Sequence, residues 1–119
     1  MTSKVIINTY RISSIILIVL GIIHCVMVFV NFEILTSEAL FSIGTGIAVL
    51  FLGLINYTAA KILNPFLLTI ASRANFIQVV YGVLSITILK DIPSIFGCFI
   101  FLLVLILSWL VKKRLVNNK

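Results

Sequence analysis

The chain has 119 residues, 62% of them hydrophobic and 10% charged, and a formal net charge of +6. A chain this short cannot bury so much apolar surface in one soluble core, because small domains leave a large share of their surface exposed. Lipid is therefore the expected outer solvent. The positive charge does not indicate a nucleic-acid-binding protein, because the basic residues are spread over three segments instead of forming one patch interleaved with aromatic residues.

Four apolar stretches have the length of transmembrane helices. About 20 apolar residues are needed to cross a hydrocarbon core of roughly 30 Å. The first stretch is too long for a typical signal-peptide core and is followed by three more, so we expect it to be retained. Pro93 suits the first turn of the last helix, where a missing N–H costs nothing. The predicted spans are residues 12–31, 40–60, 72–89 and 92–111.

The third stretch leaves two arrangements open, because its apolar run over 66–89 is interrupted by Arg73. In the first arrangement the membrane helix starts near Ser72 and Arg73 extends its long side chain to the headgroups. Residues 64–71 then form a Pro-initiated interfacial turn or short helix. In the second arrangement, one long tilted helix starts at Pro65.

The charged residues near the span ends are segregated by side. If each span crosses once, eight of the nine basic residues and none of the three acidic residues fall on one side of the membrane. Lys and Arg near span ends are retained in the cytoplasm. We therefore predict an all-α membrane protein: a four-transmembrane-helix bundle, up-down-up-down, with both termini cytoplasmic, in a bacterial inner membrane. The eight basic residues are Lys4, Arg11, Lys61, Arg73, Lys112, Lys113, Arg114 and Lys119.

Each span also carries small or polar residues at alternating spacings of three and four. A 3.5-residue average keeps one face towards a neighbour in a left-handed bundle. In lipid, small residues allow close approach and polar side chains bond between helices, so these faces are expected to point inward. The four faces are Ser14, Leu17, Gly21, His24, Val28 and Asn31; Ser42, Gly46, Val49, Gly53, Asn56 and Ala60; Asn75, Gln78, Gly82, Ser85 and Leu89; and Ser94, Cys98, Phe101, Leu105 and Ser108.

His24, the one histidine of the chain, lies inside the first span. A rise of about 1.5 Å per residue along antiparallel helices places Ser85 and Cys98 in the same layer. An ionisable residue inside a span raises a functional hypothesis: a proton relay, a metal or haem ligand, or a hydrogen bond to a quinone or lipid carbonyl. The structural alternative is a neutral histidine bonded to Ser85, Thr45 or a backbone carbonyl. The candidate ligand-binding residues are thus His24, Ser85, Cys98 and Thr45.

A second polar layer is predicted nearer the cytoplasmic ends of the second and third spans. It consists of Asn56, Tyr57, Asn75 and Gln78. Interhelical amide bonds in lipid contribute about 0.6 to 2 kcal/mol each, enough to fix the register of two helices. We interpret this layer as a helix–helix contact. The alternative is an inward-opening polar vestibule for an anionic or amphiphilic ligand.

Catalytic motifs are missing from the sequence. It contains no Gly-rich phosphate loop, carboxylate pair, Ser-His-Asp set or metal motif. Cys25 and Cys98 lack the spacing of a thiol oxidoreductase, so we expect free buried thiols. We predict a protein that is not an enzyme and has neither a metal site nor a resident cofactor.

Three segments carry a family resemblance. They are Arg11 to His24 with its Gly21-Ile-Ile-His24 ending, Phe41-Ser-Ile-Gly-Thr-Gly46, and Gly53-Leu-Ile-Asn56. With these segments the chain resembles small four-span bacterial membrane proteins, most of them uncharacterised, that are broadly DoxX-like in length and layout. The resemblance covers most of the chain in pattern. It implies the fold and the location, and it carries no catalytic residue.

Two functional hypotheses follow. The first is a noncatalytic membrane protein that acts as a subunit or accessory protein, with a membrane-protein partner or a second copy of itself. The second is a binder or carrier of a hydrophobic small molecule, a lipid, quinone or haem, near His24. In both, Lys112, Lys113 and Arg114 are expected to lie against anionic headgroups, because each basic residue near such a surface gains about 1 kcal/mol.

Overall fold

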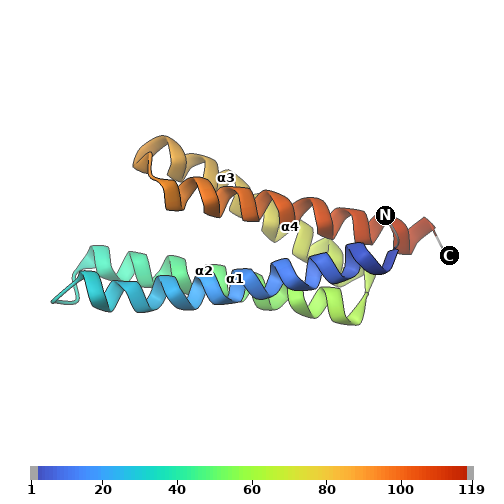
Figure 1. Cartoon of the computed structure of the whole chain (residues 1–119), viewed down its shortest axis with the longest axis horizontal. Coiled ribbons are helices and arrows are strands. Elements are labelled where there is room, and N and C mark those ends of the chain that lie inside the picture. The colour runs from blue at the N-terminus through green and yellow to red at the C-terminus, as the bar shows by residue number, and fades with distance from the viewer. Residues whose placement is uncertain (1–2, 118–119) are drawn as a thin grey trace.

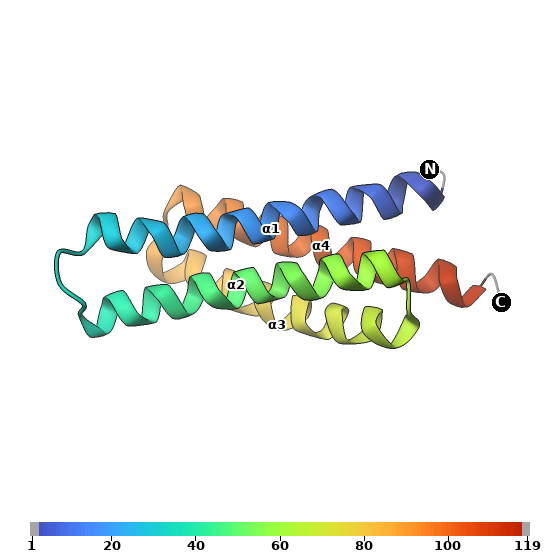
Figure 2. The same cartoon turned by 90° about the horizontal axis from the view of Figure 1, so that it is seen from below.

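The computed structural model describes residues 3–117, and this part of the chain consists of four helices joined by short connections. All four are long and apolar enough to cross a membrane. They run up-down-up-down (Figures 1 and 2), which confirms the predicted all-α four-helix bundle. The helices are α1 (Ser3–Asn31), α2 (Ser37–Ile62), α3 (Pro65–Leu89) and α4 (Ile92–Asn117).

The bundle has two unlike ends. Both termini and the α2–α3 connection lie at one end, called here the terminal end (Figure 1). The α1–α2 and α3–α4 connections lie at the other, called here the hairpin end, so the fold consists of an α1–α2 hairpin and an α3–α4 hairpin. The bundle is 54 Å long. A bilayer with its headgroups is about 40–45 Å thick, so the helices extend past the predicted spans.

α3 is one continuous helix from Pro65, with no break near Ser72. It therefore begins seven residues before the predicted third span, 72–89, and matches the alternative arrangement of one long helix. The side chain of Asn64 caps it by accepting from the N–H of Phe66 at 2.8 Å, and proline fits the first turn. The Ser72 hydroxyl donates to the Leu68 carbonyl at 2.8 Å. This polar side chain is satisfied within the helix, so it does not interrupt it.

Side-chain caps also start α2 and α4. The Thr36 hydroxyl accepts from the N–H of Ala39 at 3.2 Å. The Asp91 carboxylate accepts from the N–H of Ser94 at 2.8 Å. Hydrogen bonds from the side chain and backbone of Ser94 hold the pKa of Asp91 below its usual value. Such caps satisfy backbone donors that a helix start leaves without a partner.

Within the first hairpin, glycines let the α1 and α2 backbones touch. A Cβ at Gly21 would lie 2.6 Å from the backbone nitrogen of Leu50. A Cβ at Gly53 would lie 2.7 Å from the backbone nitrogen of Ile18. Close backbone packing of this kind drives helix association in lipid, where apolar burial alone provides little.

The α3–α4 hairpin is joined less closely. A Cβ at Gly82 would lie 3.2 Å from the Cβ of Cys98, a tight contact but a longer one than those at Gly21 and Gly53. Ser72 adds a polar link by donating to the hydroxyl of Ser108 at 3.0 Å. Packing and hydrogen bonding together thus hold this hairpin.

A reciprocal pair of amide hydrogen bonds connects the two hairpins. The Asn56 amide nitrogen donates to the Asn75 oxygen, and the Asn75 nitrogen donates to the Asn56 oxygen, both at 2.8 Å. The Tyr10 hydroxyl donates to the Asn56 oxygen at 2.6 Å, and Asn75 donates to the Ser108 hydroxyl at 3.3 Å. All four residues are fully buried. One side chain from every helix therefore joins this network, which lies in the terminal half of the bundle.

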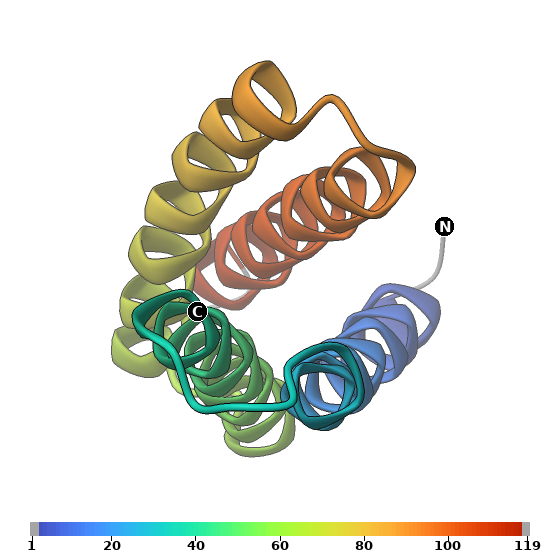
Figure 3. The same cartoon turned by 90° about the vertical axis from the view of Figure 1, so that its left-hand side faces the viewer.

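Beyond the network, the two hairpins diverge towards the hairpin end (Figures 1 and 3). The core is concentrated on the terminal side, where Tyr10, Leu17, Leu68 and Val104 are completely buried. Near the hairpin end, by contrast, Ile88 is 77% exposed and would face lipid. The bundle is closed at one end and open at the other.

Replacing Gly21 with alanine is expected to destabilise the protein in detergent by about 1–3 kcal/mol, because the new methyl group would force two helix backbones apart. Thermal unfolding monitored by circular dichroism measures the change. Gly44→Ala is the matched control, since a Cβ there meets nothing within 4 Å. Equal melting temperatures for the two variants would contradict the close-contact role of Gly21.

Replacing Asn56 with alanine is expected to lower the free energy of unfolding by about 1–3 kcal/mol, because buried polar groups on Tyr10 and Asn75 lose a partner. Chemical denaturation in mixed micelles measures the loss. Gln78→Ala is the control, because Gln78 lies one turn further along α3 and makes no side-chain hydrogen bond among the described residues. A Gln78 variant as unstable as the Asn56 variant would refute the special role of the network.

Candidate ligand cavity between the hairpins

A cavity of about 770 Å³ lies where the hairpins diverge. Its inner wall includes Gln78, which follows Asn75 by one helical turn, so the cavity begins directly beyond the amide pair. All four helices contribute to its lining. Most of this lining is apolar, with Leu20, Ile23, Met27, Val28, Val49, Phe96 and Phe101 among its members.

Two pairs of polar side chains converge on this apolar space. The Nε2 of His24 lies 3.2 Å from the hydroxyl of Ser42, linking α1 to α2. The hydroxyl of Thr45 lies 3.5 Å from that of Tyr81, linking α2 to α3. Ser85 donates to the backbone oxygen of Tyr81 at 2.9 Å. A mostly apolar cavity with a few polar groups is typical of a small-molecule site.

The charge of the lining is low. No Lys or Arg lines the cavity in the described part of the chain, and its one carboxylate is that of Asp91 at the rim. Asn31 and Ser94 accompany Asp91 there, because α1 ends and α4 begins at the hairpin end. The cavity therefore offers hydrogen bonds to an uncharged group, and no Lys or Arg of the described residues pairs with an anion there.

A metal site does not form among residues 3–117, where no three His, Cys, Asp or Glu side chains cluster. Cys25 and Cys98 are both free thiols and are half-buried. Cys25 contacts α2, with its sulfur 3.8 Å from the carbonyl oxygen of Ile43. Both thiols therefore pack against a neighbouring helix.

Three of the four predicted ligand-binding residues line the cavity: His24, Thr45 and Ser85. Cys98 does not, because its side chain packs against Gly82 within the α3–α4 hairpin. The hydrogen-bond partner of His24 is also not one of those predicted. Ser42 takes that place instead of Ser85 or Thr45.

The residues of the predicted polar layer are divided between two places. Asn56 and Asn75 form the buried pair that joins the hairpins. Gln78 lines the cavity, one turn away. Tyr57 is half-buried and takes no part in the pair. The predicted layer is thus narrower than the sequence suggested.

Sequence reasoning missed two tyrosines. Tyr10 precedes Ser14 by four residues, so it continues the inward face of α1, but it lies before the predicted start of the first span. Extending that face by one turn would have found it. Tyr81 is adjacent to Gly82 and therefore lies about 100° from the predicted inward face of α3. Only the divergence of the hairpins brings its hydroxyl to the cavity.

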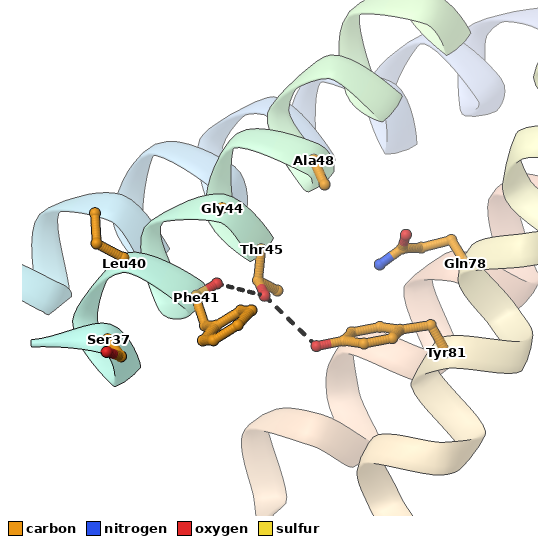
Figure 4. Close-up of a pocket in the computed structure, with 8 residues that line it drawn as sticks. All are labelled: Ser37, Leu40, Phe41, Gly44, Thr45, Ala48, Gln78 and Tyr81. Atoms are coloured by element: carbon orange, nitrogen blue, oxygen red, sulfur yellow. Dashed lines mark hydrogen bonds between the residues drawn. The ribbon is translucent and has the colours of Figure 1, made fainter.

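A second hollow, of about 650 Å³, lies between α2 and α3 and is called here the lateral groove. Figure 4 shows Gly44, Thr45 and Ala48 on α2 facing Gln78 and Tyr81 on α3. Among residues 3–117, no charged side chain lines it. The Thr45–Tyr81 contact bridges the two helices at this groove (Figure 4).

Comparison with protein-family models, with curated proteins and with solved structures finds no match to this chain. The DoxX-like resemblance therefore stays a prediction.

Proposed function

We propose that this protein is a noncatalytic multi-pass membrane protein that binds one neutral amphiphile between its two hairpins. The observation that carries the proposal is the cavity of about 770 Å³, which falls within the range of about 300–1,000 Å³ that small-molecule sites occupy. Its apolar walls suit a hydrocarbon body. The His24–Ser42 pair supplies hydrogen-bond donors and acceptors for a polar head.

The charge of the lining favours an uncharged head. A phospholipid phosphate or the propionates of a haem would enter a low-dielectric space whose described lining contains no Lys or Arg, and an isolated buried charge is costly. A carbonyl or hydroxyl group, in contrast, needs one hydrogen-bond partner. Among the lipid, quinone and haem considered from the sequence, a neutral lipid or a quinone fits best.

A second candidate function is that of a subunit that receives a helix of a partner protein in the same opening. Exposed aromatic side chains on the cavity rim favour it: Phe41 is 79% exposed and Phe96 is 52% exposed. The cavity is small for such a partner. A helix about 10 Å across fills roughly 120 Å³ per residue, so the cavity volume corresponds to about six residues.

The terminal end is proposed to face the cytoplasm of a bacterial cell, with the protein in the inner membrane. The Nζ of Lys113 lies 5.2 Å from the centre of the Trp109 ring, and tryptophan favours the headgroup level of a bilayer. Arg11 of α1 donates a hydrogen bond to the carbonyl of Ala60, near the terminal end of α2, at 3.3 Å. Lys112 and Arg114 extend this basic border towards anionic headgroups.

A reporter fused after Lys119 tests this orientation. Green fluorescent protein at that position is expected to fluoresce and alkaline phosphatase to be inactive, because clustered basic residues resist translocation. Fusions truncated after Glu33, at the hairpin end, are expected to give the opposite pair of results. Phosphatase activity from the Lys119 fusion would refute the orientation.

Native mass spectrometry of the purified protein with 1-oleoylglycerol tests the binding site. One molecule is expected to bind per chain, and Gly97→Leu is expected to weaken binding at least tenfold by filling the cavity. Gly97 lines the cavity, and a Cβ there makes only an ordinary contact, 3.9 Å from Phe101, so the variant should fold. His24→Ala is expected to weaken binding about fivefold, since one hydrogen bond contributes about 1 kcal/mol.

Ile47→Phe is the control for that experiment, because Ile47 is exposed and lines neither hollow. Oleoyl lysophosphatidic acid has the same chain with an anionic head, and it should bind more weakly. Binding that Gly97→Leu leaves unchanged would refute the proposed site. A polypeptide that copurifies stoichiometrically and is lost in Gly97→Leu would instead support the subunit function.

A further inference from the structure

The cavity and the lateral groove share one wall. Phe41, Thr45, Gln78 and Tyr81 line both. Thr45 and Tyr81 come from opposite sides of the α2–α3 gap, and their hydroxyls meet between the two spaces (Figure 4). This contact and the shared side chains beside it lie between the inside of the bundle and the face that α2 and α3 present to lipid.

The Thr45–Tyr81 contact is weak enough to open. Its oxygen–oxygen distance of 3.5 Å is long for a hydrogen bond between hydroxyls. The Thr45 hydroxyl also donates to the Phe41 carbonyl of its own helix at 3.1 Å, so Thr45 keeps a partner when Tyr81 moves away. By comparison, the amide pair of Asn56 and Asn75 has two bonds of 2.8 Å and is completely buried.

The outer side of the contact has the shape and polarity that a hydrocarbon chain requires. A Cβ at Gly44 would meet nothing within 4 Å, and Ala48, one turn along, is small and exposed. Thr45 lies 16 residues from Lys61, or about 24 Å along the helix. With Lys61 at the terminal-end headgroups, the groove opens into the hydrocarbon of the leaflet at the hairpin end.

Where the connections of the hairpin end meet the cavity, its lining includes polar groups. Asn31, Asp91 and Ser94 line its rim at the hairpin end, beside the headgroups and water. A hydrocarbon chain placed there would lose its apolar surroundings. The lateral groove therefore suits the apolar part of an amphiphile better than this polar border does.

We infer that the gap between α2 and α3 is a lateral doorway, through which a long-chain neutral amphiphile enters from the membrane and in which its chain remains. The head lies in the cavity near His24 and Ser42. The chain passes the Thr45–Tyr81 contact and lies against Gly44 in the lateral groove. This inference rests on the proposed function and specifies its ligand: a membrane-dissolved molecule with an uncharged head and a chain too long for the cavity alone.

Chain length separates the doorway from the cavity in an experiment. Binding of 1-oleoylglycerol and of 1-octanoylglycerol is measured by native mass spectrometry on the full chain. Gly44→Leu places a side chain in the groove, and its Cβ meets no atom within 4 Å, so the substitution causes no clash at the helix backbone. It is expected to weaken binding of the oleoyl probe at least tenfold and to change that of the octanoyl probe less than twofold.

Two further variants complete the test. Gly97→Leu, inside the cavity, is expected to weaken the binding of both probes. Ile47→Phe, on the lipid face beside the groove, is expected to leave the binding of both unchanged. Unchanged oleoyl binding in Gly44→Leu, together with a loss in Gly97→Leu, would overturn the doorway and leave the proposed function intact. Equal losses of both probes in Gly44→Leu would also overturn it. Unchanged binding in both glycine variants would overturn the proposed function itself.

Discussion

The reciprocal amide pair between Asn56 and Asn75 is the interaction on which the rest of the structure depends. Helices in lipid gain little from apolar burial alone, so polar and close-packed contacts decide where they meet. These two side chains satisfy each other in the fully buried centre of the terminal half. Tyr10 and Ser108 bring the remaining two helices into the same network. Because this connection lies towards one end, the hairpins are free to diverge at the other.

The two kinds of contact in the bundle have different mechanical consequences. Gly21 and Gly53 bring α1 and α2 into backbone contact along their length, so that hairpin behaves as one unit. Between the hairpins, the amide pair gives way within one turn to an apolar cavity, and the next link, Thr45 to Tyr81, is long and partly exposed. Because the strong Asn56–Asn75 pair lies next to the weak Thr45–Tyr81 contact, the site is closed towards the terminal end and accessible from lipid. The proposed ligand follows from this asymmetry and from the lack of Lys and Arg among the described residues that line the cavity.

Sequence patterns predicted the four helices because length and hydrophobicity alone determine which segments fit a bilayer. The predicted inward faces also included two residues of the buried network, Asn56 and Asn75, since their spacing repeats every 3.5 residues. They likewise included His24 and Ser85, which line the cavity. The cavity was beyond prediction, because a heptad pattern describes a closed bundle and contains no information about the angle between two hairpins. Tyr81 reaches the cavity only through that divergence. The start of α3 at Pro65 was ambiguous because Arg73 has two physical solutions. The Ser72 hydroxyl beside it bonds within the helix, whereas Asn75 bonds to α2 and α4.

Distances between spin labels in lipid nanodiscs test the central claim most directly, namely that the hairpins are fixed at one end and open at the other. Labels at Glu33→Cys and Lys90→Cys report on the hairpin end, and labels at Lys4→Cys and Val116→Cys on the terminal end, with Cys25 and Cys98 changed to alanine. Adding 1-oleoylglycerol is predicted to narrow the distribution of distances between the hairpin-end labels and to shift its mean. The distances between the terminal-end labels are predicted to stay unchanged. Equal shifts at both ends, or hairpin-end distances that are already narrow and do not respond, would contradict the account.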